Sequence, residues 1–569
     1  MLASRFRALL EASAARLQKE GRWPAGELAA FAIELPEALE HGHLAANWPL
    51  VLAKNLKRPP RELASDLISA LPADPWFARV EAAGPGFLNA FLSAEAARAA
   101  VLAVEAAGEE FAKAAPGSGE RILVEFVSAN PTGPLNVVSA RAAAYGDALA
   151  SLLTAVGHEV AREFYVNDAG AQVEALGRTV RYWLLKGSPE EVPFPEDGYK
   201  GAYVQEIAQA YLAEQVLGSP KKQLGEQEQI DALNDFVAFM NGLEEEEAVQ
   251  RLARFAVEMI GAWRERDLAR YGVHFDRFFS EAKDLRAAGR VEAALAELER
   301  QGVLYEQDGA RFMRTTLEGD DKDRVVVRKD GTATYFAADV AYHWDKYQRG
   351  FTRLIDVLGP DHHGYLARMR AAVAASGQPA ESFEVVLVQW IRLLRDGELV
   401  AMSKRGGDFV PLSEFLDEVG KDAARFTFLL RSPDSPLDFD LALAVRESSE
   451  NPVYYVQYAH ARIASLLRQV EAEGDGDLTL LAEPEELALA RRILALPEEL
   501  QQAAQARAPH HVAHYALTLA KEFHAFYSRH RILGVPQPLS QARRRLAAAV
   551  GSVLKEALGL LGVTAPERM

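Results

Sequence analysis

The sequence predicts an α/β protein in which a mostly parallel sheet is followed by an all-helical domain. Short β-rich runs alternate with helical stretches from Arg121 onward, which is typical of parallel strands joined by helices. These runs are RILVEFV (121–127), REFYV (162–166), FTRLIDVLG (351–359) and FEVVLVQW (383–390). After about residue 410 the apolar residues recur with a helical period, which breaks at SPDSP (432–436), EGDGD (473–477) and GVPQP (534–538).

A separate module precedes the sheet. Residues 1 to about 112 end in the linker AKAAPGSGE (112–120), which is rich in small residues, Pro and Gly. The opening segment MLASRFRALLEASAARLQKEGRW has the pattern of an amphipathic helix and lacks the core of a signal peptide. No apolar run is long enough to cross a bilayer, so we expect a cytoplasmic protein with no membrane partner.

Composition and charge narrow the function. The chain has no cysteine, which excludes disulfides, thiolate zinc sites and cysteine nucleophiles. His510 and His514 lack a third ligand, so we expect no metal bound by the protein itself. The net charge of −18 argues against non-specific nucleic-acid binding. The segment from Gln501 to Met569 contains nine Lys and Arg residues but only three Asp and Glu residues, so it is basic. A basic segment on an acidic chain is compatible with one specific polyanionic partner.

Two segments inside the α/β region add detail. A helical stretch from roughly 170 to 280 interrupts the sheet, and we interpret it as an insertion between the two halves of the sheet. Its acidic run, Glu244 to Glu247, is typical of a solvated helix face. The segment DRVVVRKDGTATYF (323–336) holds Asp330-Gly331 between β-branched runs and predicts a hairpin.

The segment VEFVSANPTGPLNVVSARAAAYGD (124–147) runs from a strand through a polar turn into a helix that opens near Asn136. That shape presents free backbone N–H groups and the positive end of a helix to a phosphate. The turn nevertheless matches neither glycine-rich phosphate-binding signature. The segment therefore predicts a nucleotide site with an unusual lining.

Two polar loops follow the later strands. GPDHHGY (359–365) follows the strand that ends at Leu358, so we expect Asp361, His362 and His363 at the ligand crevice. A surface loop without a binding role would have the same sequence pattern. In LVAMSKRGGDFV (399–410), Lys404 and Arg405 precede two glycines. Such a loop can close over a polyphosphate, and basic glycine-rich loops without that role are also common.

Tyr335 and Asp339 stand four residues apart in TYFAADVAYHW and would share one face of a helix. A carboxylate held there could pair with the fork of a guanidinium beside an aromatic wall. An exposed aspartate with no ligand would have the same spacing.

Together these segments resemble the arginyl-tRNA synthetases, which are class I aminoacyl-tRNA synthetases, over nearly the whole chain. VEFVSANPTGPL resembles the lead-in to the first ATP signature of the family, and AMSKR resembles the second, the KMSK loop. Further segments in the family's order are REFYVNDAGAQ (162–172), GYKGAYV (198–204), GVHFDRFFSE (272–281), VLGPDHHGY (357–365), GKDAARFTFLLRS (420–432), NPVYYVQYAHARI (451–463) and the terminal APERM. HLAANWPLVLAK and AAGPGFLNAFLS resemble the additional N-terminal domain.

The resemblance implies a Rossmann-type catalytic domain, an α+β N-terminal domain and an all-α anticodon-binding domain in a monomer. The expected boundaries are 1–112 for the additional tRNA-binding domain, 113–410 for the catalytic domain, 411–450 for a connecting helical segment and 451–569 for the anticodon-binding domain. The implied reaction activates L-arginine with ATP and Mg²⁺ to arginyl-adenylate, in the presence of tRNA(Arg). The terminal 2′-hydroxyl of the tRNA then accepts the arginyl group.

The resemblance also assigns residues. The set expected to hold arginine is Glu125, Asn130, Tyr335, Asp339 and His362, the last where many relatives have Gln. The set expected at ATP is Pro134, Asn136, Ser139, Gly359, Asp361, Met402, Ser403 and Lys404, of which Lys404, Asn136 and Ser139 are expected to be catalytic. The set expected at tRNA is Phe87, Asn89, Tyr454, Tyr458, Arg529 and Arg545. Most of these aromatic residues would serve equally well as ordinary core.

The sequence departs from the family pattern at the ATP site. The first signature, usually His-x-Gly-His, reads Asn136-Val137-Val138-Ser139, and Ala401 replaces the first lysine of the second. Val138 takes up space that glycine leaves for adenine. An alternative reading is therefore a catalytically weakened paralogue that binds arginine or RNA as a regulator. A synthetase for another amino acid fits less well, since cysteine is disfavoured by the missing thiolates and Tyr335 with Asp339 suits a guanidinium.

Overall fold

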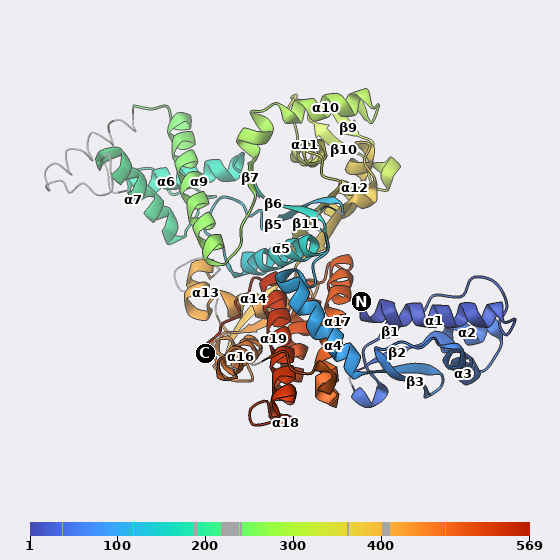
Figure 1. Cartoon of the computed structure of the whole chain (residues 1–569). Coiled ribbons are helices and arrows are strands. Elements are labelled where there is room, and N and C mark those ends of the chain that lie inside the picture. Colours follow the sequence, from blue (N-terminus) through green and yellow to red (C-terminus); the bar gives the residue numbers. More distant parts are fainter. Residues whose placement is uncertain are drawn as a thin grey trace. The chain divides into compact units, whose positions relative to one another are not determined.

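The computed structural model describes residues 1–36, 38–115, 117, 119–186, 191–217, 238, 242–360, 364–400, 410–470, 472 and 474–569. They divide into two compact units, which comprise residues 117–154 and 158–445 in one case and residues 1–116, 155–157 and 446–569 in the other. Figure 1 shows the course of the chain through both. Among the helices described, none is long and apolar enough to cross a membrane.

A five-stranded parallel sheet lies in the unit of residues 117–154 and 158–445. In spatial order its strands are β12 (Phe383–Leu387), β11 (Arg353–Leu358), β5 (Arg121–Phe126), β6 (Glu159–Val166) and β7 (Arg277–Ser280). Every neighbouring pair is parallel, which confirms the predicted fold class. The strand order reverses between β5 and β11, and at such a point the carboxyl ends of the strands border a ligand crevice.

Helices on opposite faces of β5 fix the environment of this crevice. On one face, α5 (Val137–Ala155) packs so closely that a β-carbon at Gly146 would lie 2.2 Å from the ring of Phe126. Side chains alternate along a strand, so neighbouring Glu125 points to the other face. There α11 (Tyr335–Gln348) contributes Val340 and Ala341 to a core cluster that also contains Leu123 of β5.

A helical insertion lies between β6 and β7, which is within one half of the sheet and not between its two halves as predicted, and its described residues form three helices. They are α6 (Ala171–Leu185), α7 (Ala202–Leu217) and α9 (Glu245–Arg270), and they lie together in Figure 1 around their own apolar cluster. The acidic run is exposed, and Glu245, Glu246 and Glu247 occupy the first turn of α9. Negative charge at that end of a helix is favoured by the helix dipole.

Besides short 3-10 helices, this unit contains a π-helix (Glu281–Arg286), α10 (Arg290–Arg300), β8 (Leu304–Gln307), β9 (Ala310–Met313), β10 (Arg324–Val327), α12 (Tyr365–Ala375), β13 (Ile391–Arg395), β14 (Glu398–Leu399), α13 (Leu412–Val419), α14 (Lys421–Leu429), β15 (Leu437–Asp440) and α15 (Leu441–Ala444).

This part of the unit differs from the sequence prediction at two places. The predicted hairpin closes only at Val327 and Ala333, because Thr334 caps α11 and turns its second arm into helix. Strand β15, which pairs with β13, interrupts the stretch expected to be helical.

The other unit combines a four-stranded antiparallel sheet with long helices. The sheet has the order β1 (Ile33–Glu34), β2 (Leu44–Ala46), β4 (Phe87–Leu92) and β3 (Phe77–Ala83). Its helices are α1 (Leu2–Lys19), α2 (Trp48–Leu56), α3 (Pro60–Ala70), α4 (Ala94–Ala107), α16 (Pro452–Gln469), α17 (Pro484–Gln505), α18 (Pro509–Arg529) and α19 (Gln537–Leu560). The predicted opening helix is amphipathic, since Phe6, Leu10 and Leu17 are buried on one face of α1.

One buried carboxylate ties two C-terminal helices together, and its removal should destabilise them. Glu486 accepts a hydrogen bond from the Glu483 backbone at 3.0 Å, closing the N-terminal cap of α17, and another from Arg543 of α19 at 2.7 Å. Glu486→Ala would leave a buried guanidinium unpaired, so we expect a loss of about 3–5 kcal/mol in the free energy of unfolding. Urea titration measures it. The exposed Gln501→Ala on the same helix is the control, and equal loss in both variants would contradict the assignment.

Candidate functional site

A buried lysine joins the two central strands of the sheet at the switch point. Glu125 of β5 and Asp356 of β11 are register partners, so their carboxylates lie side by side on one face. The ammonium of Lys346, on α11, donates to Glu125 Oε2 at 2.6 Å and to Asp356 Oδ1 at 3.2 Å. Lys346 is 0% exposed. Burial alone would lower the pKa of Lys346, but the charges of Asp356 and Glu125 raise it above its usual value.

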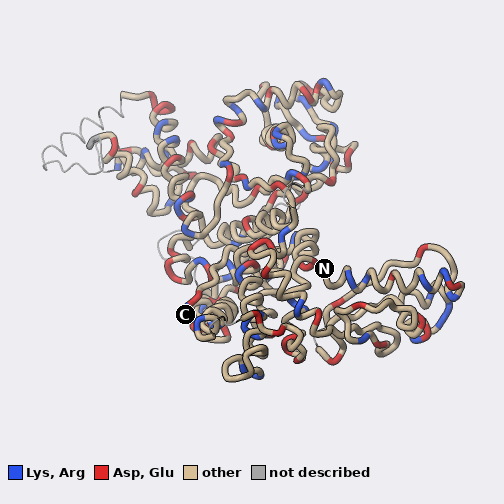
Figure 2. The backbone as a smooth tube through the Cα atoms, in the orientation of Figure 1, with Lys and Arg blue, Asp and Glu red and all other residues tan. Residues whose placement is uncertain are grey.

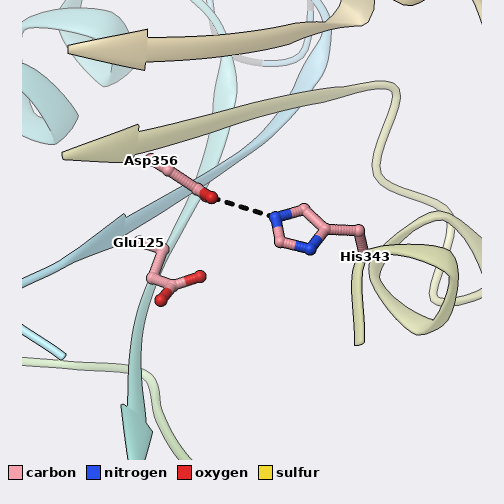
Figure 3. A group of neighbouring side chains, drawn as sticks. All are labelled: Glu125, His343 and Asp356. Atoms are coloured by element: carbon pink, nitrogen blue, oxygen red, sulfur yellow. Dashed lines mark hydrogen bonds and ion pairs between the residues drawn. The ribbon is translucent and has the colours of Figure 1, made fainter. Parts of the chain in front are cut away.

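His343 extends this network along α11. Its Nε2 lies 2.9 Å from Asp356 Oδ2, the contact dashed in Figure 3, and its Nδ1 lies 2.8 Å from the backbone oxygen of Asp339. Both ring nitrogens therefore face acceptors. Although burial opposes it, the charges of Lys346 and His343 lower the pKa of Asp356. Asp356 is thus held as a carboxylate inside the protein.

Glu125, His343 and Asp356 also have the spacing of a metal site, because one ligand atom from each lies within 4.8 Å of the others. The donor set is plausible for a cation in general. However, the Lys346 ammonium already contacts both carboxylates at hydrogen-bond distance. A lysine in that place supplies the positive charge that a metal ion would otherwise bring, so these residues do not fit a metal centre.

Asp339 lies two turns before Lys346 on the same helix, and no Lys or Arg among the described residues pairs with it. It is half-buried, and burial followed by the charges of Glu125, Glu281 and Asp356 raises the pKa of Asp339 to about 7, against the opposing effect of His343. Tyr335 begins α11 and is 60% exposed. Four residues apart on a helix, as the sequence predicted, the phenol and the carboxyl share a face that can receive a planar cation.

The turn after β5 has a strained backbone. Val127 and Ser128 have φ values of +69° and +38°, a region that residues other than glycine rarely adopt and that costs about 1–3 kcal/mol per residue. The hydroxyl of Ser128 partly offsets this cost, because it donates to Glu125 Oε1 at 2.8 Å and accepts from the Tyr165 backbone at 3.1 Å. The turn and Glu125 are therefore positioned together.

The N-terminus of α5 lies beside residues 410–412, which follow the second signature in the sequence. Asn136 caps the helix, since its Oδ1 accepts from the Ser139 backbone at 3.0 Å and from the Ser139 hydroxyl at 3.3 Å. The Val137 N–H donates to Val410 and the Leu412 N–H donates to Leu135, so the segment that leaves the KMSK-like loop pairs with the mouth of α5. Two stretches far apart in the sequence meet here.

Several expected site residues lie outside the described part of the chain. These are Asp361, His362, Met402, Ser403 and Lys404. Of the others, Pro134 is half-buried in the turn before α5, Asn130 is exposed in the same turn, and Gly359 is exposed directly after β11. Glu125, Asn136 and Ser139 occupy the places described above.

The residues expected at tRNA lie in the other unit and differ in exposure. Phe87 is half-buried at the start of β4, and Asn89, 4% exposed, has a buried Oδ1 that finds no hydrogen-bond partner among the described residues. Tyr454 and Tyr458 stack on α16 with ring centroids 6.0 Å apart.

Both arginines expected at tRNA form ion pairs. Arg529 is exposed and pairs with Glu485. Arg545 is paired with Glu105 at 2.5 Å. Along the backbone tube of Figure 2, Lys and Arg positions alternate with Asp and Glu positions.

Sequence reasoning missed Lys346, His343 and Arg264. A signal was present for the first two, because Asp339, His343 and Lys346 follow the i, i+4, i+7 spacing of one helix face in a helix otherwise rich in apolar residues. Arg264 of α9 contacts the turn 129–133, which lies more than 130 residues away in sequence, and no local pattern indicates it.

Three family models match the chain. They are "Arginyl tRNA synthetase N terminal domain" over residues 4–92, "tRNA synthetases class I (R), catalytic domain" over 103–430 and "DALR anticodon binding domain" over 456–569. Arginine–tRNA ligases of Citrifermentans bemidjiense and Azoarcus sp. are 44% and 46% identical, over 97% and 95% of both chains. The arginyl-tRNA synthetase structure of Thermus thermophilus, 25% identical, matches with a TM-score of 0.73 over 99% of this chain and all of its own.

The Lys346 pairs should contribute stability in a pH-dependent way. In Lys346→Met, Glu125 and Asp356 would be buried without a cation, so we expect a loss of about 3–5 kcal/mol at pH 8. The pKa of Asp356 is depressed in the folded wild type. That contribution is fully present in the wild type at both pH 8 and pH 5, since both lie above the unfolded carboxyl pKa of about 3.9. In Lys346→Met the two buried carboxyls lack a cation, which raises their pKa values, so they take up protons as pH falls and the deficit should shrink toward pH 5. Urea titrations at both pH values measure this, with exposed Lys283→Met as control. A deficit independent of pH would contradict the account.

Proposed function

The chain belongs to the arginyl-tRNA synthetase family and is an arginine–tRNA ligase, and from this we propose how its residues divide the reaction. The ligase joins arginine to tRNA at the expense of ATP. Adenylate chemistry depends on placement and charge stabilisation more than on a covalent nucleophile. The proposal therefore concerns which groups hold arginine, ATP and tRNA.

We assign the guanidinium of arginine to Asp339 and Tyr335. The observation that carries this assignment is a half-buried carboxyl that pairs with no Lys or Arg in the described part of the chain, and whose pKa of about 7 reflects burial and neighbouring carboxylates. A guanidinium would supply the missing charge and both donors of a fork-shaped pair. Lysine offers a single ammonium and citrulline no charge, so either would leave the carboxylate partly unpaired.

Glu125 is assigned to the α-amino group. Its two oxygens are oriented by Lys346 and Ser128 at 2.6 and 2.8 Å, and each keeps a lone pair for a further donor. Asn130, exposed in the adjacent turn, is assigned to the backbone of the amino acid. This places the carboxylate of arginine toward the N-terminus of α5.

ATP, with Mg²⁺ as part of the substrate, is assigned to the mouth of α5. The positive end of the helix dipole favours phosphate there, while the N–H groups of Val137 and Ser139 bond to Val410 and Asn136. The side chain of Asn136 retains its amide donor because the cap uses only its oxygen. Pro134, Ser139, Gly359, Asp361, His362, Met402, Ser403 and Lys404 complete the proposed ATP and arginine sites. Lys404 is proposed to stabilise the charge that develops as pyrophosphate leaves.

The tRNA contacts, domain limits and cellular setting are also proposals. Phe87 and Asn89 would meet the body of the tRNA from the 1–112 domain, and Tyr454 and Tyr458 would offer a stacking platform in the 451–569 domain. Arg529 would bind phosphate, and Arg545 would first have to leave Glu105. We propose a cytoplasmic monomer with a catalytic domain over 113–410 and a connecting segment over 411–450.

Arginine affinity should depend on pH through Asp339. Below pH 7 the carboxyl is mostly protonated and cannot pair fully with a guanidinium, so the KM for arginine should rise about tenfold from pH 8 to pH 6. Arginine-dependent ATP–pyrophosphate exchange at varied arginine gives this KM. Asp339→Asn should raise the KM about a hundredfold or more and flatten its pH dependence. A wild-type KM constant across this range would remove Asp339 from the guanidinium site.

Activity itself is tested by the same exchange with and without tRNA(Arg), using lysine as the control amino acid. Exchange that requires arginine and tRNA is expected, and it would show that the Asn-Val-Val-Ser lining supports catalysis. Absence of exchange under every condition, from folded protein that binds tRNA, would favour the alternative of a catalytically weakened paralogue that binds arginine or RNA.

A further inference from the structure

A buried guanidinium from the helical insertion holds the turn that precedes α5. Arg264 of α9 is 5% exposed. Its Nη1 donates to the backbone oxygen of Ala129 at 2.8 Å, its Nε donates to that of Gly133 at 3.0 Å, and its Nη2 donates to those of Asn130 and Gly133. One side chain thus satisfies three carbonyls of a single five-residue turn.

A second residue of the insertion holds the same turn from α7. The hydroxyl of Tyr203 donates to the backbone oxygen of Thr132 at 2.6 Å. Its ring packs so near Gly133 that a β-carbon there would lie 3.3 Å from the ring and the hydroxyl. The two contacts leave little freedom to the segment between the strained Val127 and the start of α5.

Arg264 also lacks the usual counter-charge. In the described residues its partners are all carbonyl oxygens, and no carboxylate pairs with it. A buried guanidinium is costly unless its donors are well placed, and burial lowers the pKa of Arg264 to about 10. For the stability of the insertion alone, an apolar residue would serve as well. The fork of donors is therefore matched to the turn.

We propose that Arg264 and Tyr203 are positioning residues for nucleotide binding. They fix residues 129–133 in the conformation that aligns the N-terminus of α5 with the phosphates of ATP. This inference rests on the proposed ATP site at the mouth of α5. It makes the insertion part of the active-site architecture, since α7 and α9 each supply one contact to the turn.

Arg264→Lys separates charge from geometry, because lysine keeps the positive charge and cannot form the planar fork. Tyr203→Phe removes one hydroxyl and keeps the ring. The matched controls are Arg254→Lys, an exposed position on α9, and Tyr182→Phe, a half-buried tyrosine of α6 that makes ring contacts with Trp183 and Phe194. The full chain is used throughout.

The test measures the KM for ATP and kcat in arginine-dependent exchange with tRNA(Arg), and the Kd for MgATP by calorimetry. We expect a KM and Kd for ATP at least tenfold higher in Arg264→Lys and about threefold higher in Tyr203→Phe. The kcat of Tyr203→Phe should stay within twofold and its melting temperature within a few degrees of wild type. The controls should match wild type.

Values for Arg264→Lys and Tyr203→Phe within twofold of wild type would overturn the inference, as would a rise confined to the KM for arginine. The calorimetric arm separates this inference from the proposed activity. A wild type that binds MgATP without exchange would refute the activity, and the Kd of the variants would still decide the role of Arg264. A wild type that binds no MgATP would overturn both.

Discussion

The ammonium of Lys346 has no contact with solvent and lies between two carboxylates of adjacent strands. Taking three charges out of water is costly, and the cost is offset only if donors and acceptors meet in good geometry. Here they meet because β5 and β11 place Glu125 and Asp356 in register. The same contact fixes the position of α11 along the strands of the sheet. It therefore also fixes where the side chains at the N-terminal end of that helix lie.

Charge is distributed unevenly along α11 as a result. Near its C-terminal end the protein supplies the cation, and Asp356 stays ionised. Two turns earlier no described Lys or Arg pairs with Asp339, and burial with the charges of Glu125, Glu281 and Asp356 raises its pKa to about 7. A cationic substrate would supply the positive charge that the Asp339 carboxylate can pair with. In the proposed arrangement, Lys346 orients Glu125 for the α-amino group of arginine, and α11 carries Asp339 for its guanidinium.

Local pattern was enough for the parallel sheet, the helical character of the insertion and the shared face of Tyr335 and Asp339, because strand alternation and helical period are properties of neighbouring residues. It did not show that the insertion lies between β6 and β7, within one half of the sheet. The residues that hold the site are different. Lys346 meets Glu125 across 221 positions and Arg264 meets Ala129 across 135, and such pairs exist only after the chain has folded. Likewise, Thr334 ended the expected hairpin by capping α11, a choice between two local signals that the tertiary structure decided.

The central claim is that Lys346 positions Glu125 directly, and Asp339 through α11, for the two ends of arginine. A crystal structure of the protein with a non-reactive arginyl-adenylate analogue tests it directly. The account predicts the guanidinium within hydrogen-bond distance of Asp339, the α-amino group on Glu125, and both Lys346 contacts kept. A guanidinium bound away from Asp339, or a Glu125 released from Lys346, would contradict it.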